Sequence, residues 1–225
     1  MVAQRIIRGY RTISHEAACV LAGTLPRELD AQSFSSVLFW RKEAYRRSGQ
    51  RPALREVEAK LASLRSAAVE EWRSRLESPS AGVVTVAAVR PVLQQWMDRR
   101  HGAPTFRLTQ VLTGHSSFGA YLCRIVGVKE TAVCHHCGNC RDDAAQHTLE
   151  ECPAWNEERS ALVAVVGRDL SLPTVIAAMV GSRRSWKAML SCERVISQKE
   201  SAERDREQTD PARRNRRRRR RRDNT

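Results

Sequence analysis

Four of the seven cysteines and three of the six histidines of this chain lie within residues 134–152, CHHCGNCRDDAAQHTLEEC. This segment is polar and has no other obvious reason to fold. Clustered thiols and imidazoles are the donors that structural zinc requires. The odd number of cysteines, in a chain whose first residues lack a continuous apolar signal sequence, argues against disulfides. The segment is therefore expected to fold around a metal ion.

The spacing C-x2-C-x9-H-x4-C indicates a Cys3His zinc site formed by Cys134, Cys137, His147 and Cys152. The first two thiols can face inward across a single turn, and the second pair comes from a separate short unit. Four protein ligands complete a tetrahedron and leave no open position. We therefore expect Zn²⁺ with a structural role and not a catalytic one.

Two alternatives to this ligand set stay open from the residues alone. Cys140 forms a second C-x2-C pair with Cys137 and can replace Cys134 as a ligand. The cysteines can also be reduced thiols in a polar loop without metal. Gly138 is placed where a tight turn would direct amides at the thiolates, and Leu149 can provide apolar cover.

Outside the cysteine segment, apolar residues recur with helical periodicity, and no stretch alternates over six residues as a half-buried strand would. The strongest stripe lies in residues 53–77: Leu54, Val57, Leu61, Leu64, Ala68, Trp72 and Leu76. Further helices are expected from Ser14 to Gly23, from Pro26 past Trp40 to Arg47, across Pro91, on both sides of residues 113–115, and as about three helices separated by Gly167, Pro173 and Gly181. The predicted fold is mainly α, with a small inserted zinc knuckle.

The formal net charge of +14 is concentrated at the C-terminus, where residues 213–222 hold nine arginines. A segment of like charges without apolar residues is expected to be disordered when unbound, here from residue 208 to 225. No run of about 18 apolar residues exists, so no membrane span is expected. The other predicted units are residues 1–50, a helical domain at 51–130, the zinc knuckle at 131–155 and C-terminal helices at 156–207.

Four blocks of the sequence carry a family resemblance: RGYRTISHEAACVLAGTLPRELDA, FRLTQVLTGHSSFGAYLCRI, CHHCGNC and AQHTLEECPAW. In this order they resemble the C-terminal region of the reverse-transcriptase polyprotein of type-1 non-LTR retrotransposons, over nearly the whole chain to about residue 207. The resemblance implies a Cys-Cys-His-Cys knuckle at Cys134, Cys137, His147 and Cys152. It also implies that residues 1–50 follow a polymerase thumb missing from this chain.

The chain lacks the catalytic motifs of the polyprotein that it resembles. The polymerase of that family needs a carboxylate pair on a hairpin, and the only adjacent aspartates, Asp142 and Asp143, lie in the zinc loop. No endonuclease block is present. We therefore expect a truncated or degenerate copy that is not itself an enzyme, although the parent polyprotein is an RNA-directed DNA polymerase with an endonuclease.

The function expected from this resemblance is binding of RNA or target DNA in target-primed reverse transcription, in the nucleus, with a cytoplasmic ribonucleoprotein as a second location. Stacking and phosphate contacts are the forces that hold unpaired nucleic acid. The candidate contact residues are His135, His136, Arg141 and Trp155 in the knuckle, Arg46, Arg47, Arg99 and Arg100 on helices, and Arg216, Arg217, Arg218, Arg219 and Arg220 in the tail.

A different class of function stays open beside nucleic-acid binding. The amphipathic helix at residues 53–77 can drive self-association or docking to a retroelement polymerase, and the chain can also be a relic without function. Apolar surface around Val20, Leu21 and Phe34 is expected to be exposed. His115 is expected to pack its own turn, because no acid partner supports a catalytic triad.

Overall fold

The structure, a computed structural model, describes residues 2–138, 140–210 and 215. These residues form helices and connecting loops, with no strand among them, which confirms the mainly α prediction. None of the helices in this part of the chain is long and apolar enough to cross a membrane. The helices are α1 (Val2–Ile6), α2 (His15–Ala22), α3 (Arg27–Ser48), α4 (Leu54–Arg75), α5 (Val83–Val89), η1 (Arg90–Val92), α6 (Leu93–Asp98), α7 (Phe106–Thr113), α8 (Gly119–Arg124), η2 (His147–Glu151), η3 (Pro153–Trp155), α9 (Asn156–Val166), α10 (Leu172–Gly181), α11 (Arg183–Ser191) and α12 (Glu193–Thr209).

Local capping signals place the helix ends where the sequence predicts them. The Ser14 hydroxyl accepts a hydrogen bond from the Ala17 amide at 3.2 Å and begins α2. Gly23 ends the same helix at a φ of +63°, a left-handed conformation that glycine adopts without a Cβ clash. Pro91 interrupts its helix as expected, because η1 separates α5 from α6.

The C-terminal third of the chain differs from its prediction in helix number. In the described part of the chain, four α-helices follow the cysteine segment instead of about three. Pro173 does not separate two of them: it lies in the first turn of α10, where the missing N–H costs nothing. The last helix, α12, also continues to Thr209, past the predicted start of the tail at residue 208. The predicted disorder of the remaining tail and the arginines Arg216 to Arg220 lie outside the described residues.

One apolar core joins helices from both ends of the chain. Its fully buried members include Ile7, Leu21, Leu112 and Met189. The Trp96 indole reaches across this core and donates a hydrogen bond to the Leu21 carbonyl at 3.1 Å. The expectation that Val20 and Leu21 are exposed is therefore wrong, since both are 0% accessible. Helices from other parts of the chain cover these two side chains, and the local sequence does not show this packing.

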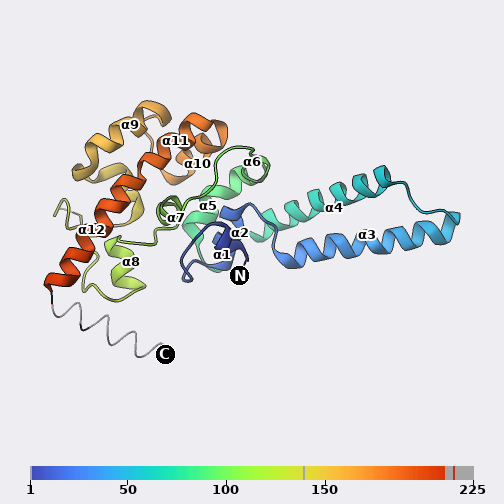
Figure 1. The fold of residues 1–225 in the computed structure, drawn as a ribbon, viewed down its shortest axis with the longest axis horizontal. Coiled ribbons are helices and arrows are strands. Elements are labelled where there is room, and N and C mark those ends of the chain that lie inside the picture. The colour runs from blue at the N-terminus through green and yellow to red at the C-terminus, as the bar shows by residue number, and fades with distance from the viewer. Residues whose placement is uncertain (1, 139, 211–214, 216–225) are drawn as a thin grey trace.

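The helices α3 and α4 pair as a long hairpin that projects from the rest of the molecule (Figure 1). At the base of the hairpin Leu29 and Trp72 are buried and join the main core. Further out, Val57, Leu61 and Leu64 are half-buried in the predicted apolar stripe of α4. This face of α4 is therefore occupied by α3 within the same chain. The predicted boundary at residue 50 falls in the turn between the two helices.

Candidate metal centre

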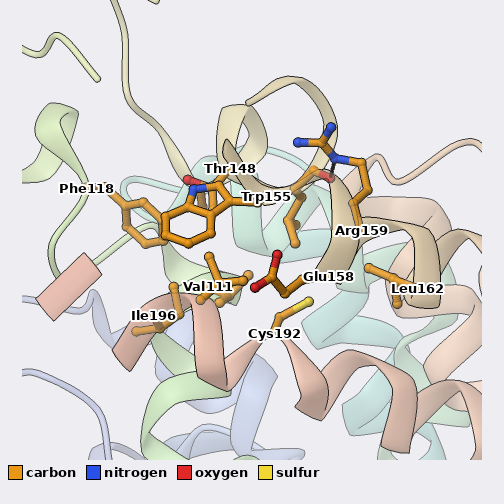
Figure 2. Close-up of a pocket in the computed structure, with 12 residues that line it drawn as sticks. Val111, Phe118, Thr148, Trp155, Glu158, Arg159, Leu162, Cys192 and Ile196 are labelled. Atoms are coloured by element: carbon orange, nitrogen blue, oxygen red, sulfur yellow. Dashed lines mark hydrogen bonds between the residues drawn. The ribbon is translucent and has the colours of Figure 1, made fainter. Parts of the chain in front are cut away.

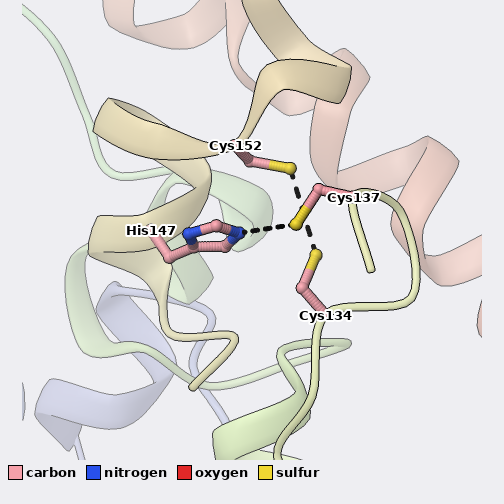
Figure 3. Close-up of side chains that lie close together, drawn as sticks. All are labelled: Cys134, Cys137, His147 and Cys152. Atoms are coloured by element: carbon pink, nitrogen blue, oxygen red, sulfur yellow. Dashed lines mark hydrogen bonds between the residues drawn. The ribbon is translucent and has the colours of Figure 1, made fainter. Parts of the chain in front are cut away.

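The structure brings together the four side chains that the spacing indicated, Cys134, Cys137, His147 and Cys152 (Figure 3). Their thiol sulfurs and the imidazole nitrogen all lie within 4.8 Å of one another. The Sγ atoms of Cys134 and Cys152 are 3.9 Å apart, and the Sγ of Cys137 is 3.5 Å from Nε2 of His147. Such a group of three thiols and one imidazole can hold a metal ion.

These two distances fit the edges of a zinc tetrahedron. With Zn–S bonds of about 2.3 Å and a Zn–N bond of about 2.0–2.1 Å, tetrahedral angles give an S···S edge of about 3.8 Å and an S···N edge of about 3.5 Å. The observed 3.9 Å and 3.5 Å agree with both values. The donor set also fits zinc chemically, because three soft sulfurs with one imidazole is an established structural zinc combination.

Two separate short units position the donors. Cys134 and Cys137 lie on a turn closed by a hydrogen bond from the Gly138 amide to the Cys134 carbonyl at 3.1 Å. Gly138 has a φ of +68°, so a Cβ at this position would strain the turn. The second unit is the π-helical turn η2, where the Cys152 amide donates to the His147 carbonyl at 2.8 Å and holds the second pair of donors together.

A carboxylate orients the histidine. Nδ1 of His147 lies 3.2 Å from a carboxylate oxygen of Glu151, one helical turn later. A proton on Nδ1 makes this hydrogen bond and leaves the Nε2 lone pair directed at the thiols. This carboxylate–histidine arrangement is the usual second layer around a bound zinc ion.

Burial raises the pKa of two of the three thiols, those of Cys134 and Cys152. The pKa of Cys134 is raised chiefly by burial. The pKa of Cys152 is raised to about 12, first by burial and then by the neighbouring Cys134. In the absence of a cation these thiols are therefore protonated at neutral pH. Because a metal must displace those protons, its binding is expected to strengthen as pH rises.

Cys140 is not part of the cluster. Its Sγ lies 3.1 Å from the Asp142 carbonyl and accepts a hydrogen bond from the Asp142 amide at 3.3 Å. The structure therefore assigns the fourth donor position to Cys134, which is 0% exposed, and not to Cys140. Cys134 and Cys152 are both 0% exposed, so they do not lie in a solvated polar loop, as the alternative without metal assumed.

The metal-binding loop is attached to the last helix, α12. Cys134, Cys152 and Trp155 form a small apolar cluster with Val195 of α12. Beside it, Nζ of Lys199 lies 2.8 Å from a carboxylate oxygen of Asp143, and the two side chains are 0% and 3% exposed. A second Asp143 oxygen accepts the Gly119 amide at 2.9 Å. This carboxylate therefore links the loop to α8 and α12.

The structure corrects the prediction that Trp155 contacts nucleic acid. Its side chain is only 7% exposed and points into an apolar pocket with Ile196, Cys192 and Val111 (Figure 2). The pocket measures about 20 Å³, room for about one water molecule. Trp155 therefore packs the loop against the body and cannot stack on a base in this conformation.

The other knuckle residues divide between packed and exposed. The His136 ring lies 4.9 Å from Trp155 between centroids. Burial, followed by repulsion from Lys199 and Arg206, lowers its pKa to about 4, so this ring is neutral near pH 7. His135 and Arg141 are exposed on the loop.

The arginines predicted to contact nucleic acid from helices differ in how exposed they are. Arg46 and Arg47 are 77% and 68% exposed near the tip of the hairpin, and Arg100 is exposed as well. Arg99 is half-buried: its guanidinium carbon lies 4.0 Å from the centroid of the Trp96 ring, and burial lowers its pKa to about 10. Arg99 is therefore less accessible to phosphates than Arg100, which is exposed.

Two residues at this centre were missed from the sequence. Glu151 lies four residues after His147, a spacing that places both on one helical face and that could have indicated the pair. Asp143 was considered only as half of an aspartate pair unsuited to polymerase chemistry. Nothing local signals its partner Lys199, which lies 56 residues further along the chain.

One comparison with known proteins agrees with the resemblance to a type-1 retrotransposon polyprotein. No protein-family model matches the chain. No solved structure matches it. The chain is 31% identical over 196 residues to the Retrovirus-related Pol polyprotein from type-1 retrotransposable element R1 4 of Nasonia vitripennis. The match covers 84% of this chain and 48% of that relative, so the chain spans about half the length of the polyprotein it resembles.

Proposed function

We propose that this chain is a nucleic-acid-binding region of a type-1 retrotransposon Pol polyprotein, with a structural zinc ion held by Cys134, Cys137, His147 and Cys152. The observation that carries this proposal is the donor cluster, two of whose separations, 3.9 Å and 3.5 Å, match the edges of a zinc tetrahedron, in a chain similar to such a polyprotein. Zinc, when bound, supplies folding free energy and no chemistry of reaction.

The charge of the chain supports a polyanionic partner. The net charge is +14, and exposed cations occur both on the knuckle loop and near the tip of the hairpin. The proposed ligand is the element's RNA or its target DNA during target-primed reverse transcription, which places the chain in the nucleus beside a retroelement polymerase. Its role in that reaction is to hold nucleic acid and not to catalyse a step.

The test is binding of the full chain to single-stranded and duplex oligonucleotides at about 150 mM salt. All nine arginines of residues 213–222 are replaced by serine in a second version of the full chain, called the tail-neutral chain, because an arginine run binds any polyanion and would obscure the contribution of the body. We expect this tail-neutral chain to keep binding with zinc present and, after chelation, to lose the part of that binding that the metal-binding loop contributes. Zinc-independent binding that disappears with the tail arginines would contradict the proposal.

A further inference from the structure

The helix α3 carries a second apolar stripe on its side, next to the row that packs on its partner α4. Phe34, Leu38 and Tyr45 are 45%, 57% and 54% exposed, and Arg41 lies on the same line of the helix. Their spacing of i, i+4, i+7 and i+11 puts them on one face about 16 Å long. The row that packs inward includes Ser33 and Val37, roughly 100° around the helix.

Cations surround this outer stripe. Arg41, Lys42, Arg46 and Arg47 lie in the same half of α3, where the one acidic residue is Glu43. Arg46 and Arg47 flank the Glu43 carboxylate at 3.7 and 4.0 Å. This half of the helix therefore keeps a net positive charge next to its exposed apolar side chains.

One cation already lies over an aromatic ring of the stripe. The guanidinium carbon of Arg65, on α4, is 5.2 Å from the centroid of the Phe34 ring. This cation–π contact holds the ring at the edge of the hairpin while it stays 45% exposed. At its Phe34 end the stripe therefore presents an exposed aromatic ring beside a cation, and its other half carries the cations of α3.

We infer that the outer face of α3, formed by Phe34, Leu38, Arg41 and Tyr45, binds an unpaired nucleic-acid strand. An apolar partner helix would bury Arg41 without a counter-charge, which is costly. A second copy of the chain would bring two positively charged stretches together. An unpaired strand offers both phosphates for the cations and base faces for the aromatic rings. The inference rests on the proposed function and assigns the partner to a site distant from the metal centre.

The inference separates single strands from duplexes. Bases in a duplex are stacked on one another, so the rings of Phe34 and Tyr45 would reach them poorly, whereas the cations can contact phosphates in either form. Removing the rings should therefore weaken single-strand binding alone. Removing the cations should weaken both forms and reduce the dependence of binding on salt.

The experiment compares variants of the full tail-neutral chain with zinc present, using a 5′-labelled single strand of about 20 nucleotides and its duplex. We expect Phe34→Ala/Tyr45→Ala to lower single-strand affinity at least about tenfold, because stacking on one aromatic residue is worth about 1–3 kcal/mol. Duplex affinity should change less than about twofold. The matched control is Val83→Ala/Val84→Ala, which removes two side chains that are 56% and 72% exposed on α5.

The charge variant Arg41→Gln/Arg46→Gln should lower the salt slope of single-strand binding by about 1.4, since each phosphate contact contributes about 0.7. Circular dichroism checks that every variant keeps its helix content. Photo-cross-linking of a thiouridine-substituted strand should label peptides from residues 31–48. Labelling confined to residues 131–155 would overturn the inference.

The outcomes keep the two proposals apart. If the tail-neutral chain binds no oligonucleotide, the proposed function fails and this inference fails with it. If the tail-neutral chain binds a single strand and its Phe34→Ala/Tyr45→Ala variant binds equally well, the outer face of α3 is not the site, although the proposed function stands. A variant that loses self-association in sedimentation experiments but keeps strand binding would assign the face to protein contacts and also overturn the inference.

Discussion

A single hydrogen bond from Nδ1 of His147 to the Glu151 carboxylate sets the orientation of the imidazole at the candidate metal centre. Replacing Glu151 with alanine removes the acceptor 3.2 Å from Nδ1 and lets the imidazole rotate away from the thiols. We expect zinc affinity to fall about 10- to 100-fold, the usual effect of losing a second-layer partner. Competition with a chromophoric chelator measures it. Glu150→Ala is the matched control, and equal affinities for the two variants would contradict the assigned role.

His115 lies away from the metal centre, and its burial affects how the stability of the fold depends on pH. Its ring packs 4.7 Å from Tyr121 between centroids, and burial lowers its pKa below the ordinary value. The unfolded chain therefore takes up the proton first, at about pH 6.5, and the stability associated with the neutral ring is present above that pH and lost as pH falls through the folded pKa. The prediction that this histidine packs its own turn agrees with its hydrogen bond to the Thr113 carbonyl at 2.9 Å.

The variant His115→Gln should accordingly lose less unfolding free energy between pH 7 and pH 5 than the parent chain does. Urea denaturation at both pH values, with zinc at the same saturation, measures the difference. Other titrating groups are common to both proteins and cancel in the comparison. A parallel loss in the two proteins would show that the buried ring does not contribute to acid sensitivity.

At the scale of elements, the hairpin of α3 and α4 is held to the body through its base. Trp72 is 2% exposed and belongs to the main core, while Phe39 further along α3 is 73% exposed. Truncating a buried tryptophan leaves a cavity, so Trp72→Ala should lower the free energy of unfolding by about 3–5 kcal/mol. Phe39→Ala should change it by less than about 0.5 kcal/mol. Denaturant titration of both variants tests this difference.

The ion pair of Asp143 with Lys199 joins the metal-binding loop to α12. Because both groups are buried, Lys199→Met leaves a carboxylate without its partner and should cost about 3–5 kcal/mol. The double variant Asp143→Asn/Lys199→Met removes both charges and should cost much less than the sum of the single variants. The side-chain carbonyl that Asp143→Asn introduces can still accept a hydrogen bond from the Gly119 amide.

The exposed pair of Arg124 with Asp142 provides the control for that cycle. Its atoms are 3.0 Å apart but its side chains are 60% and 50% exposed, so Arg124→Gln should cost at most about 1 kcal/mol. Unfolding free energies from a double-mutant cycle give the coupling energy. Additive costs for Asp143→Asn and Lys199→Met would show that burial does not couple the two charges.

At the scale of the whole molecule, the metal centre and the hairpin lie at opposite ends of the structure (Figure 1). The small cluster around Cys134 and Cys152 contacts α12 through Val195 and has no member in the hairpin. Structural zinc contributes roughly 10 kcal/mol to folding in small modules. Chelation should therefore expose amides of residues 131–155 and α12 to hydrogen exchange while α3 and α4 stay protected. A uniform loss of protection by mass spectrometry would show one cooperative unit instead.

The sequence by itself determined the features that depend on neighbouring residues. The C-x2-C-x9-H-x4-C spacing identified the four donors because all of them lie within nineteen residues. Helix ends followed from caps such as Ser14 and Gly23, whose hydrogen bonds span only a few positions. The 53–77 stripe predicted α4 because amphipathic periodicity is a property of one segment.

Only the tertiary structure decided which side chains stay accessible. Trp155 looks like a nucleic-acid contact in the sequence, but long-range packing buries it. Arg99 is half-buried against the rings of Trp96 and Trp186. The same packing chose α3 as the partner of α4 and placed Lys199 beside Asp143, a contact that no local pattern encodes. Burial depends on which distant segment lies opposite a residue, and this choice is made by the free energy of the whole core.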